Sequence, residues 1–163
     1  MLQVLFGARE MPLKLQSIGH VITNASHEAL RHQTAVSKIV IDRKFARGLE
    51  GLEDFSHIYV LFWLHEMPLP SHRLRVHPRG RLDIEKVGVF AARSPHRPNP
   101  IGLTLVKLLS KKGRILTVRG LDAYDGTPVL DIKPYDTRDS TPRPRVPAWW
   151  RKLERESKRA RRS

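Results

Sequence analysis

The sequence predicts a mainly β fold, either a small barrel or a sandwich of short strands, from three observations. Short runs of apolar and β-branched residues recur through the middle of the chain, and turn residues separate them. Few segments have the apolar spacing of a helix, which disfavours a sheet built from alternating strands and helices. No GxGxxG sequence follows an expected strand, so a dinucleotide-binding fold is not supported.

The strongest expected strand is 56–65 (SHIYVLFWLH), which is apolar on both faces and rich in β-branched and aromatic residues. Such a run is typical of a central, buried strand. Segment 45–55 has apolar residues at helical spacing but contains two glycines, so we expect a short helix or turns. The sequences SKKG at 110–113 and Asp125-Gly126 predict hairpin turns. The remaining expected strands are 15–22, 37–41, 73–77, 87–92, 102–109, 114–121 and 129–133.

The composition limits the class of protein. A length of 163 residues is typical of one domain. The absence of cysteine excludes disulfides and thiolate metal sites, and the histidine pattern does not favour a metal site either. No apolar run reaches about 18 residues, and the N-terminus has no basic leader, so we expect no transmembrane helix, no signal peptide and a cytoplasmic location.

The formal net charge is +14, and half of it lies between Arg138 and Ser163, where ten basic residues face three acidic ones. Such a tail suits a polyanion, most simply the phosphates of a nucleic acid. The alternative is a charged, solvated terminus. A membrane anchor is disfavoured because large apolar residues in the tail are few.

The end of the tail predicts a C-terminal helix over 148–162. Helix-forming residues fill this segment, and Glu154 precedes Lys158 by one helical turn. The alternative is a segment that orders only on binding.

Residues 93–104 (RSPHRPNPIGLT) form the most distinctive stretch of the chain. Three prolines within six residues fix the backbone and remove hydrogen-bond donors. The resulting stiff loop carries Arg93, His96, Arg97 and Asn99 between two apolar runs. A rigid loop that presents polar groups is typical of a binding site, although a proline-rich connector is the alternative.

Four carboxylates are suited to acid–base chemistry: Asp122, Asp125, Asp131 and Asp136. Asp125 precedes a glycine and is more typical of a turn. Asp131 lies within an apolar run and needs a partner, which Lys133, two residues later and on the same face of a strand, could supply.

Four blocks of the sequence resemble the TsaA/YaeB-like (TrmO) family of tRNA methyltransferases. They occur in the family's order over about residues 13–136. The blocks are IGHVI at 18–22, FSH at 55–57, VFAARSPHRPNPIG at 89–102 and DGTPVLDIKPY at 125–135.

The resemblance implies a small β-barrel that uses S-adenosylmethionine to methylate N6 of threonylcarbamoyl-adenosine beside the anticodon. It also implies tRNA as partner, and a dimer with the cofactor near the interface. Accordingly we expect an N-terminal extension over 1–12, the barrel domain over 13–136, and a Pro/Arg-rich basic tail over 137–163.

The resemblance also implies site residues. Cofactor contacts are expected at Gln33, His65, Glu66, Arg93, Leu105, Asp125, Gly126 and Thr127. For His65 the alternative is a hydrogen-bonded structural histidine.

For the proton on N6, our hypothesis is that Asp131 acts as the base, or that Tyr135 acts as a hydrogen-bonding partner. The alternative is that Asp131 simply pairs with Lys133. Arg97 and Asn99 either face the substrate or brace the proline loop.

Longer bacterial members of the family carry an additional C-terminal domain that helps to hold tRNA, where this chain has its arginine-rich tail. We hypothesise that the tail takes over that electrostatic work. The residues expected to contact tRNA are Arg151, Lys152, Lys158, Arg159, Arg161 and Arg162.

Two other functions are compatible with the sequence. One is a non-catalytic basic β-barrel that binds RNA, which would have no affinity for S-adenosylmethionine. The other is a methyltransferase of the same fold with another acceptor, because loop shape decides the acceptor.

Deleting residues 148–163 should weaken tRNA binding and flatten its dependence on salt. Each phosphate contact that is lost removes about 0.7–0.9 from the slope of log affinity against log salt concentration. Titrations of tRNA over a salt series measure this slope, and an unchanged slope would contradict the hypothesis.

Overall fold

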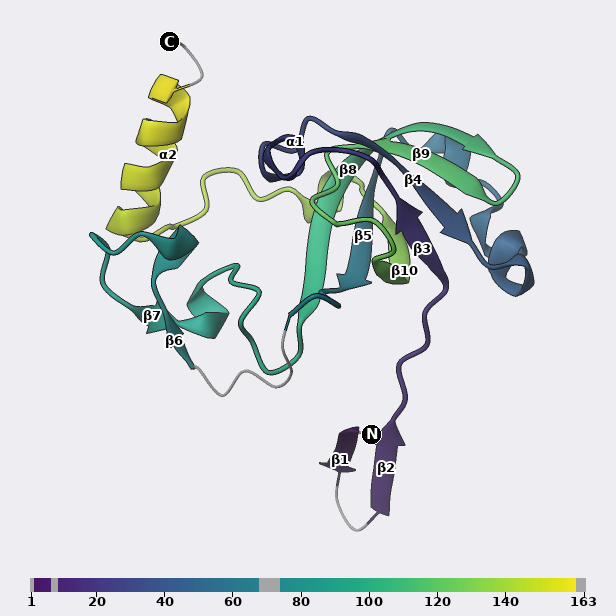
Figure 1. Cartoon of the computed structure of the whole chain (residues 1–163), viewed down its shortest axis with the longest axis horizontal. Coiled ribbons are helices and arrows are strands. Elements are labelled where there is room, and N and C mark those ends of the chain that lie inside the picture. The colour runs from purple at the N-terminus through teal and green to yellow at the C-terminus, as the bar shows by residue number, and fades with distance from the viewer. Residues whose placement is uncertain (1, 7–8, 68–73, 161–163) are drawn as a thin grey trace.

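The computed structural model describes residues 2–6, 9–67 and 74–160. Six antiparallel strands form a closed barrel in the order β10–β3–β4–β9–β8–β5 (Figure 1). The strands are β3 (Gly19–Ile22), β4 (Val36–Ile41), β5 (His57–Trp63), β8 (Ile101–Lys112), β9 (Ile115–Arg119) and β10 (Pro128–Pro134). The predicted mainly β class is confirmed, and of the two predicted architectures the chain adopts the barrel.

Strand β5 has hydrogen-bonded neighbours on both sides, β8 and β10, as expected of a central strand. Its side chains alternate between the interior and the outer face, so Ile58, Val60 and Phe62 are buried while the residues between them are half-buried. The prediction that the strand is central is therefore confirmed, although only every second residue is buried, because a barrel strand has one face turned outward.

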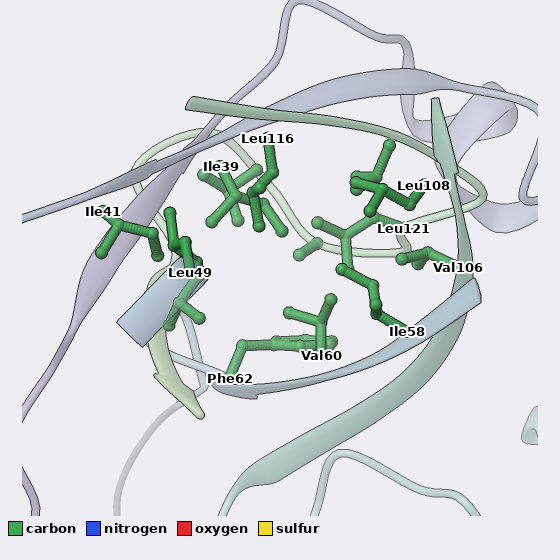
Figure 2. Packing of buried hydrophobic residues seen from close by; sticks show 14 residues of the cluster. Ile39, Ile41, Leu49, Ile58, Val60, Phe62, Val106, Leu108, Leu116 and Leu121 are labelled. Atoms are coloured by element: carbon green, nitrogen blue, oxygen red, sulfur yellow. The ribbon is translucent and has the colours of Figure 1, made fainter. Parts of the chain in front are cut away.

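The interior of the barrel is filled by alternating aliphatic residues from all six strands (Figure 2). Ile39, Val60, Leu116 and Val118 are fully buried there. Leu49, from the 3₁₀ helix η1 (Arg43–Leu49), packs against the same core. Together with η2 (Leu52–Asp54), this helix confirms the short helix or turns expected over 45–55.

The two predicted hairpin turns have different outcomes. Strands β8 and β9 form the expected hairpin around Gly113, whose φ of 56° is left-handed. The sequence Asp125-Gly126 forms a turn, but β9 and β10 are not neighbours in the barrel. Instead, the Gly126 N–H donates to the Val21 carbonyl of β3 at 2.9 Å. The hairpin predicted there is therefore wrong, because β3 pairs with β10 in place of β9.

Small elements lie outside the barrel. Strands β1 (Leu2–Phe6) and β2 (Arg9–Leu13) form a separate hairpin at the N-terminus, and β6 (Arg75–Val76) pairs with β7 (Val87–Gly88). The strand expected over 87–92 ends at Gly88 and continues as the 3₁₀ helix η4 (Val89–Ala91). Of the strand expected over 73–77, Arg73 lies outside the described residues. Helix α1 (His27–Arg31), capped by Ser26, was not expected. Two further 3₁₀ turns are η3 (Pro78–Gly80) and η5 (Thr137–Asp139).

Helix α2 (Ala148–Ala160) confirms the predicted C-terminal helix, including the Glu154–Lys158 ion pair at 2.8 Å. It stands beside β6 and β7, away from the barrel (Figure 1). Its residue Leu153 is buried, with 3% of its surface exposed. Within the described residues, no helix is long and apolar enough to cross a membrane.

A close approach between β5 and β8 depends on Gly102, which pairs directly with Phe62. A Cβ atom at position 102 would lie 2.3 Å from the Phe62 ring, which is buried in the core. The ring can therefore cover the backbone of β8 only because position 102 is glycine.

Replacing Gly102→Ala should destabilise the fold by about 1–3 kcal/mol, because the Phe62 ring must move out of a packed core. Gly48→Ala is the matched control, since a Cβ there meets nothing within 4 Å. Urea unfolding of both variants measures the difference in free energy. Equal stability of the two variants would contradict this account of Gly102.

Candidate functional site

A cavity of about 610 Å³ brings together segments that are far apart in the sequence. Its walls come from the second residue after α1, the end of β5, the proline loop, the start of β8 and the loop before β10. The lining includes apolar and charged side chains, among them Leu103, Leu105, Arg93, Glu66 and Asp122. This mixture is typical of a small-molecule site, in which a few polar groups orient a largely apolar ligand.

Six of the eight predicted cofactor residues line this cavity. They are Gln33, His65, Glu66, Arg93, Leu105 and Thr127. The other two, Asp125 and Gly126, lie in the turn between Tyr124 and Thr127, both of which line it. The Asp125 carboxylate accepts from the Thr23 N–H at 2.9 Å, so it fastens that turn to the end of β3.

Gln33 reaches the cavity through an unusual backbone conformation. Its φ is 56°, in the left-handed region that often terminates a helix. Its N–H donates to the Leu30 carbonyl of α1 at 3.0 Å. The C-terminal end of α1 therefore fixes the position of Gln33 in the cavity wall.

His65 and Thr127 join two walls of the cavity. The Thr127 hydroxyl and the His65 Nδ1 are 3.4 Å apart, and Thr127 is 2% exposed while His65 remains exposed. His65 therefore has a polar neighbour, as its structural alternative requires, and it also faces the cavity.

Sequence reasoning gave too little weight to Asp122. The buried hydroxyl of Thr104 donates to Asp122 Oδ1, and both residues line the cavity. The sequence places Asp122 among four candidate carboxylates. What distinguishes it from the other three is its hydrogen bond with Thr104 of β8. The two residues are distant in the sequence, so no local pattern shows this contact.

The two predicted catalytic residues are not brought to this cavity. Asp131 lines a different cavity of about 680 Å³ beside η1 and η2. Its Oδ2 pairs with Lys133 Nζ at 2.8 Å, the alternative considered above, and the hydrogen bond that Lys133 donates to Asp131 raises the pKa of Lys133.

Tyr135 packs against the Tyr59 ring, with centroids 5.7 Å apart, and lies outside the lining as well. Burial, followed by the charge of Asp139, raises the pKa of the Tyr59 hydroxyl in this cluster.

The proline loop forms part of the cavity wall, as predicted. Its residues Arg93, Ser94, Pro95 and Arg97 line the cavity. The Pro100 carbonyl accepts from the Leu64 N–H at 2.8 Å, which fixes the loop beside the end of β5. Asn99 is exposed and is not part of the lining.

The tail residues predicted to contact tRNA have different surroundings. Lys152 pairs with Asp83 and Lys158 with Glu154, both at 2.8 Å. Arg151 is exposed, and Arg159 has an interaction partner. Arg161 and Arg162 lie outside the described residues. Arg81, followed by Lys152, holds the pKa of the Asp83 carboxyl well below its usual range, so this contact stays charged.

Among the described residues, no group of three or more His, Cys, Asp or Glu side chains is arranged to hold a metal ion.

Comparison with known proteins identifies relatives of most of this chain. Residues 22–139 match the family model described as the tRNA-methyltransferase O N-terminal domain. The chain is 53% identical over 105 residues to a probable S-adenosyl-L-methionine-binding protein of Methanothermobacter thermautotrophicus, covering 64% of this chain and 73% of that protein. It is 50% identical over 95 residues to a tRNA (adenine(37)-N6)-methyltransferase of Homo sapiens, covering 58% of this chain but 21% of that protein.

Solved structures show the same fold. A crystal structure of TrmO from Pseudomonas aeruginosa matches with a TM-score of 0.66 and 33% identity, covering 83% of this chain and 61% of that one. A further crystal structure of TrmO matches with a TM-score of 0.68 and 29% identity, covering 93% and 77%. Several relatives are much longer than the matched region. The chain covers 41% of a second archaeal relative, from Archaeoglobus fulgidus, and 21% of the human protein.

Proposed function

Because the chain belongs to the family of the tRNA-methyltransferase O N-terminal domain, we propose that it is an S-adenosylmethionine-dependent tRNA methyltransferase. Its acceptor is N6 of adenosine beside the anticodon, in the threonylcarbamoyl form. The observation that carries this proposal is the single cavity that gathers six of the eight residues expected from the sequence to hold the cofactor. The proposal includes a cytoplasmic location, because tRNA is its expected substrate.

The cavity residues fit the cofactor. A volume of about 610 Å³ falls within the range of about 300–1,000 Å³ for small-molecule sites. Leu103 and Leu105 would offer apolar surface to the adenosine, Arg93 would donate to the carboxylate, and Glu66 would accept from the ammonium. Within the described residues, neither Arg93 nor Glu66 is engaged in an ion pair, so both charges are available to a ligand.

When bound, S-adenosylmethionine supplies an activated methyl group on a positively charged sulfur. The chain's residues then have to orient the acceptor and remove its proton. The N6 nitrogen is a weak nucleophile because its lone pair is delocalised into the ring, so removal of its proton assists the reaction. In this proposal Asp122 would accept the N6 proton at Oδ2, while the cofactor would supply the methyl group.

Thr104 prepares Asp122 for this role. Its buried hydroxyl donates to Oδ1 of the same carboxylate, which fixes the orientation of the group and leaves Oδ2 for the substrate. Positioning of this kind supplies much of the rate enhancement in group transfer. Asp122 therefore replaces Asp131 as the proposed base.

We also propose a homodimer formed through the outer face of β5 and β8. Leu61 pairs with Leu103 and Tyr59 with Leu105 across these strands, which makes this face apolar. Leu103 is 51% exposed and Leu105 40%, although both line the cavity. A second copy seated on this face would cover the leucines and close one side of the cofactor cavity.

Replacing Asp122→Asn should lower kcat by about 10²- to 10⁴-fold, because general-base assistance is lost. Cofactor affinity should change little, since Arg93 and Glu66 remain. Mass spectrometry of the nucleosides of treated tRNA measures methylation, and calorimetry measures cofactor binding.

Asp131→Asn is the control for the base, because that carboxylate faces another cavity, and its turnover should stay at the wild-type level. Full activity of the Asp122 variant together with loss of activity in the Asp131 variant would reverse the assignment. A wild-type chain that binds tRNA but shows no heat of cofactor binding would instead be a non-catalytic RNA-binding barrel. Cofactor binding without methylated threonylcarbamoyl-adenosine would indicate another acceptor.

Replacing Leu103→Glu should convert the dimer to a monomer, because two carboxylates would be buried against an apolar face. Light scattering measures the molar mass. Ile22→Glu is the control, since Ile22 is 46% exposed on β3, which is not part of this face. A monomeric wild-type chain, or a Leu103 variant with unchanged mass, would refute the proposed interface.

A further inference from the structure

A second cavity, of about 920 Å³, lies beside helix α2. Its walls come from the segment around β6 and β7, from residues 90–96 and from Trp149 and Trp150 at the start of α2. It shares Phe90, Arg93 and Pro95 with the cofactor cavity, so the two cavities border the same segment of chain.

The lining of this second cavity combines aromatic surface with positive charge. Phe90 is 79% exposed, and the two tryptophans are half-buried. Arg79, Lys86 and Arg93 add positive charge, and none of the described lining residues is Asp or Glu. Aromatic rings interleaved with cations are the usual means of binding unpaired nucleotides, because bases stack on the rings and phosphates contact the cations.

The docking of α2 creates this arrangement. Arg81 pairs with Glu156 at 2.6 Å, and Lys152 pairs with Asp83 at 2.8 Å. Buried Leu153 anchors the same face of the helix. Asp83 and Glu156 are thus neutralised outside the cavity, while the two tryptophans at the helix start are held in its wall.

We propose that the second cavity binds unpaired nucleotides of the RNA substrate next to the adenosine that enters the cofactor cavity. This inference rests on the proposed function, and it adds a specific single-stranded RNA site. A flanking base stacks on Trp149 or Trp150, and its phosphate contacts Arg79. Residues 90–95 separate the flanking nucleotide from the acceptor adenosine. An acidic peptide is less suited to this cavity, because it would use the cations but not the three aromatic rings.

Tryptophan fluorescence tests contact between RNA and the second cavity. In the full chain with Trp63→Phe, the remaining emission comes only from Trp149 and Trp150. A stem-loop RNA with a single-stranded loop should quench this emission, and a fully paired RNA duplex of equal length should not. Equal quenching by the duplex or by poly-glutamate, or an absence of quenching by the stem-loop, would overturn the proposal.

Variants test how much the lining residues of the second cavity contribute to the free energy of RNA binding. Arg79→Asn removes one cation at a left-handed position (φ 52°) that asparagine tolerates well. It should weaken stem-loop binding severalfold and reduce the salt slope by about 0.7. Arg143→Asn is the matched control, because Arg143 is exposed, has a φ of 61° and lies outside the lining. Equal effects of the two variants would overturn the assignment of Arg79.

The tryptophans are tested together. Replacing both Trp149→Leu and Trp150→Leu should weaken stem-loop binding by about 5- to 150-fold, the loss expected for one stacked base. Replacing both with phenylalanine should restore most of the affinity, which a purely structural role in docking α2 would not require. Wild-type affinity in the leucine variant would overturn the proposal.

The proposed function can fail separately from this inference. If stem-loop quenching occurs but methyl transfer does not, the enzymatic assignment fails and the RNA site stands. If methyl transfer proceeds and none of the cavity variants changes RNA affinity, the RNA site fails and the enzymatic assignment stands.

Discussion

The site depends on the pairing of β5 with two neighbours at once. Strand β5 follows β8 in continuous register from His57–Lys107 to Trp63–Ile101, and its other edge pairs with β10. The contact with β8 continues past the end of the strand, where Leu64 donates to the Pro100 carbonyl. The pairing of β5 therefore both closes the barrel and places His65 and Glu66 beside the proline loop. Without this double pairing the cavity would lack two of its walls.

Residues 90–95 link the two cavities physically. Phe90, Arg93 and Pro95 contribute to both linings, and the prolines that follow restrict how far this segment can move. In the proposed complex, a stiff common wall would keep the distance between the cofactor and the flanking nucleotide constant. Methyl transfer requires in-line approach of the acceptor nitrogen, so holding a nucleotide beside the acceptor is a direct way to meet that geometric demand.

Local sequence patterns predicted what local interactions determine. Short runs of apolar and β-branched residues between turn residues predicted the barrel strands, and the helix-forming residues with the spacing of Glu154 and Lys158 predicted α2. The family resemblance, rather than any spacing, pointed to His65, Arg93 and Thr127. Asp122 was passed over because its selection depends on Thr104 from another strand. The prediction that β9 and β10 form a hairpin was wrong, because closure of the barrel places β3 beside β10. A two-residue turn signal carries no information on which distant strands pair. The domain boundaries at residues 12 and 136 stay predictions.

Fewer positive charges of the tail are available to phosphates than its composition suggests. A charge count treats every Lys and Arg between 138 and 163 as available to phosphates, yet Lys152 and Lys158 are paired with carboxylates. Exposed pairs of this kind contribute little to stability, but the Lys152–Asp83 pair joins α2 to the segment between β6 and β7. On this view α2 contributes to RNA binding mainly by holding Trp149 and Trp150 against a cavity whose cations come from Arg75, Arg79, Lys86 and Arg93. Specific contact with unpaired bases then depends on the position of the helix, and its charge supports the long-range attraction of tRNA.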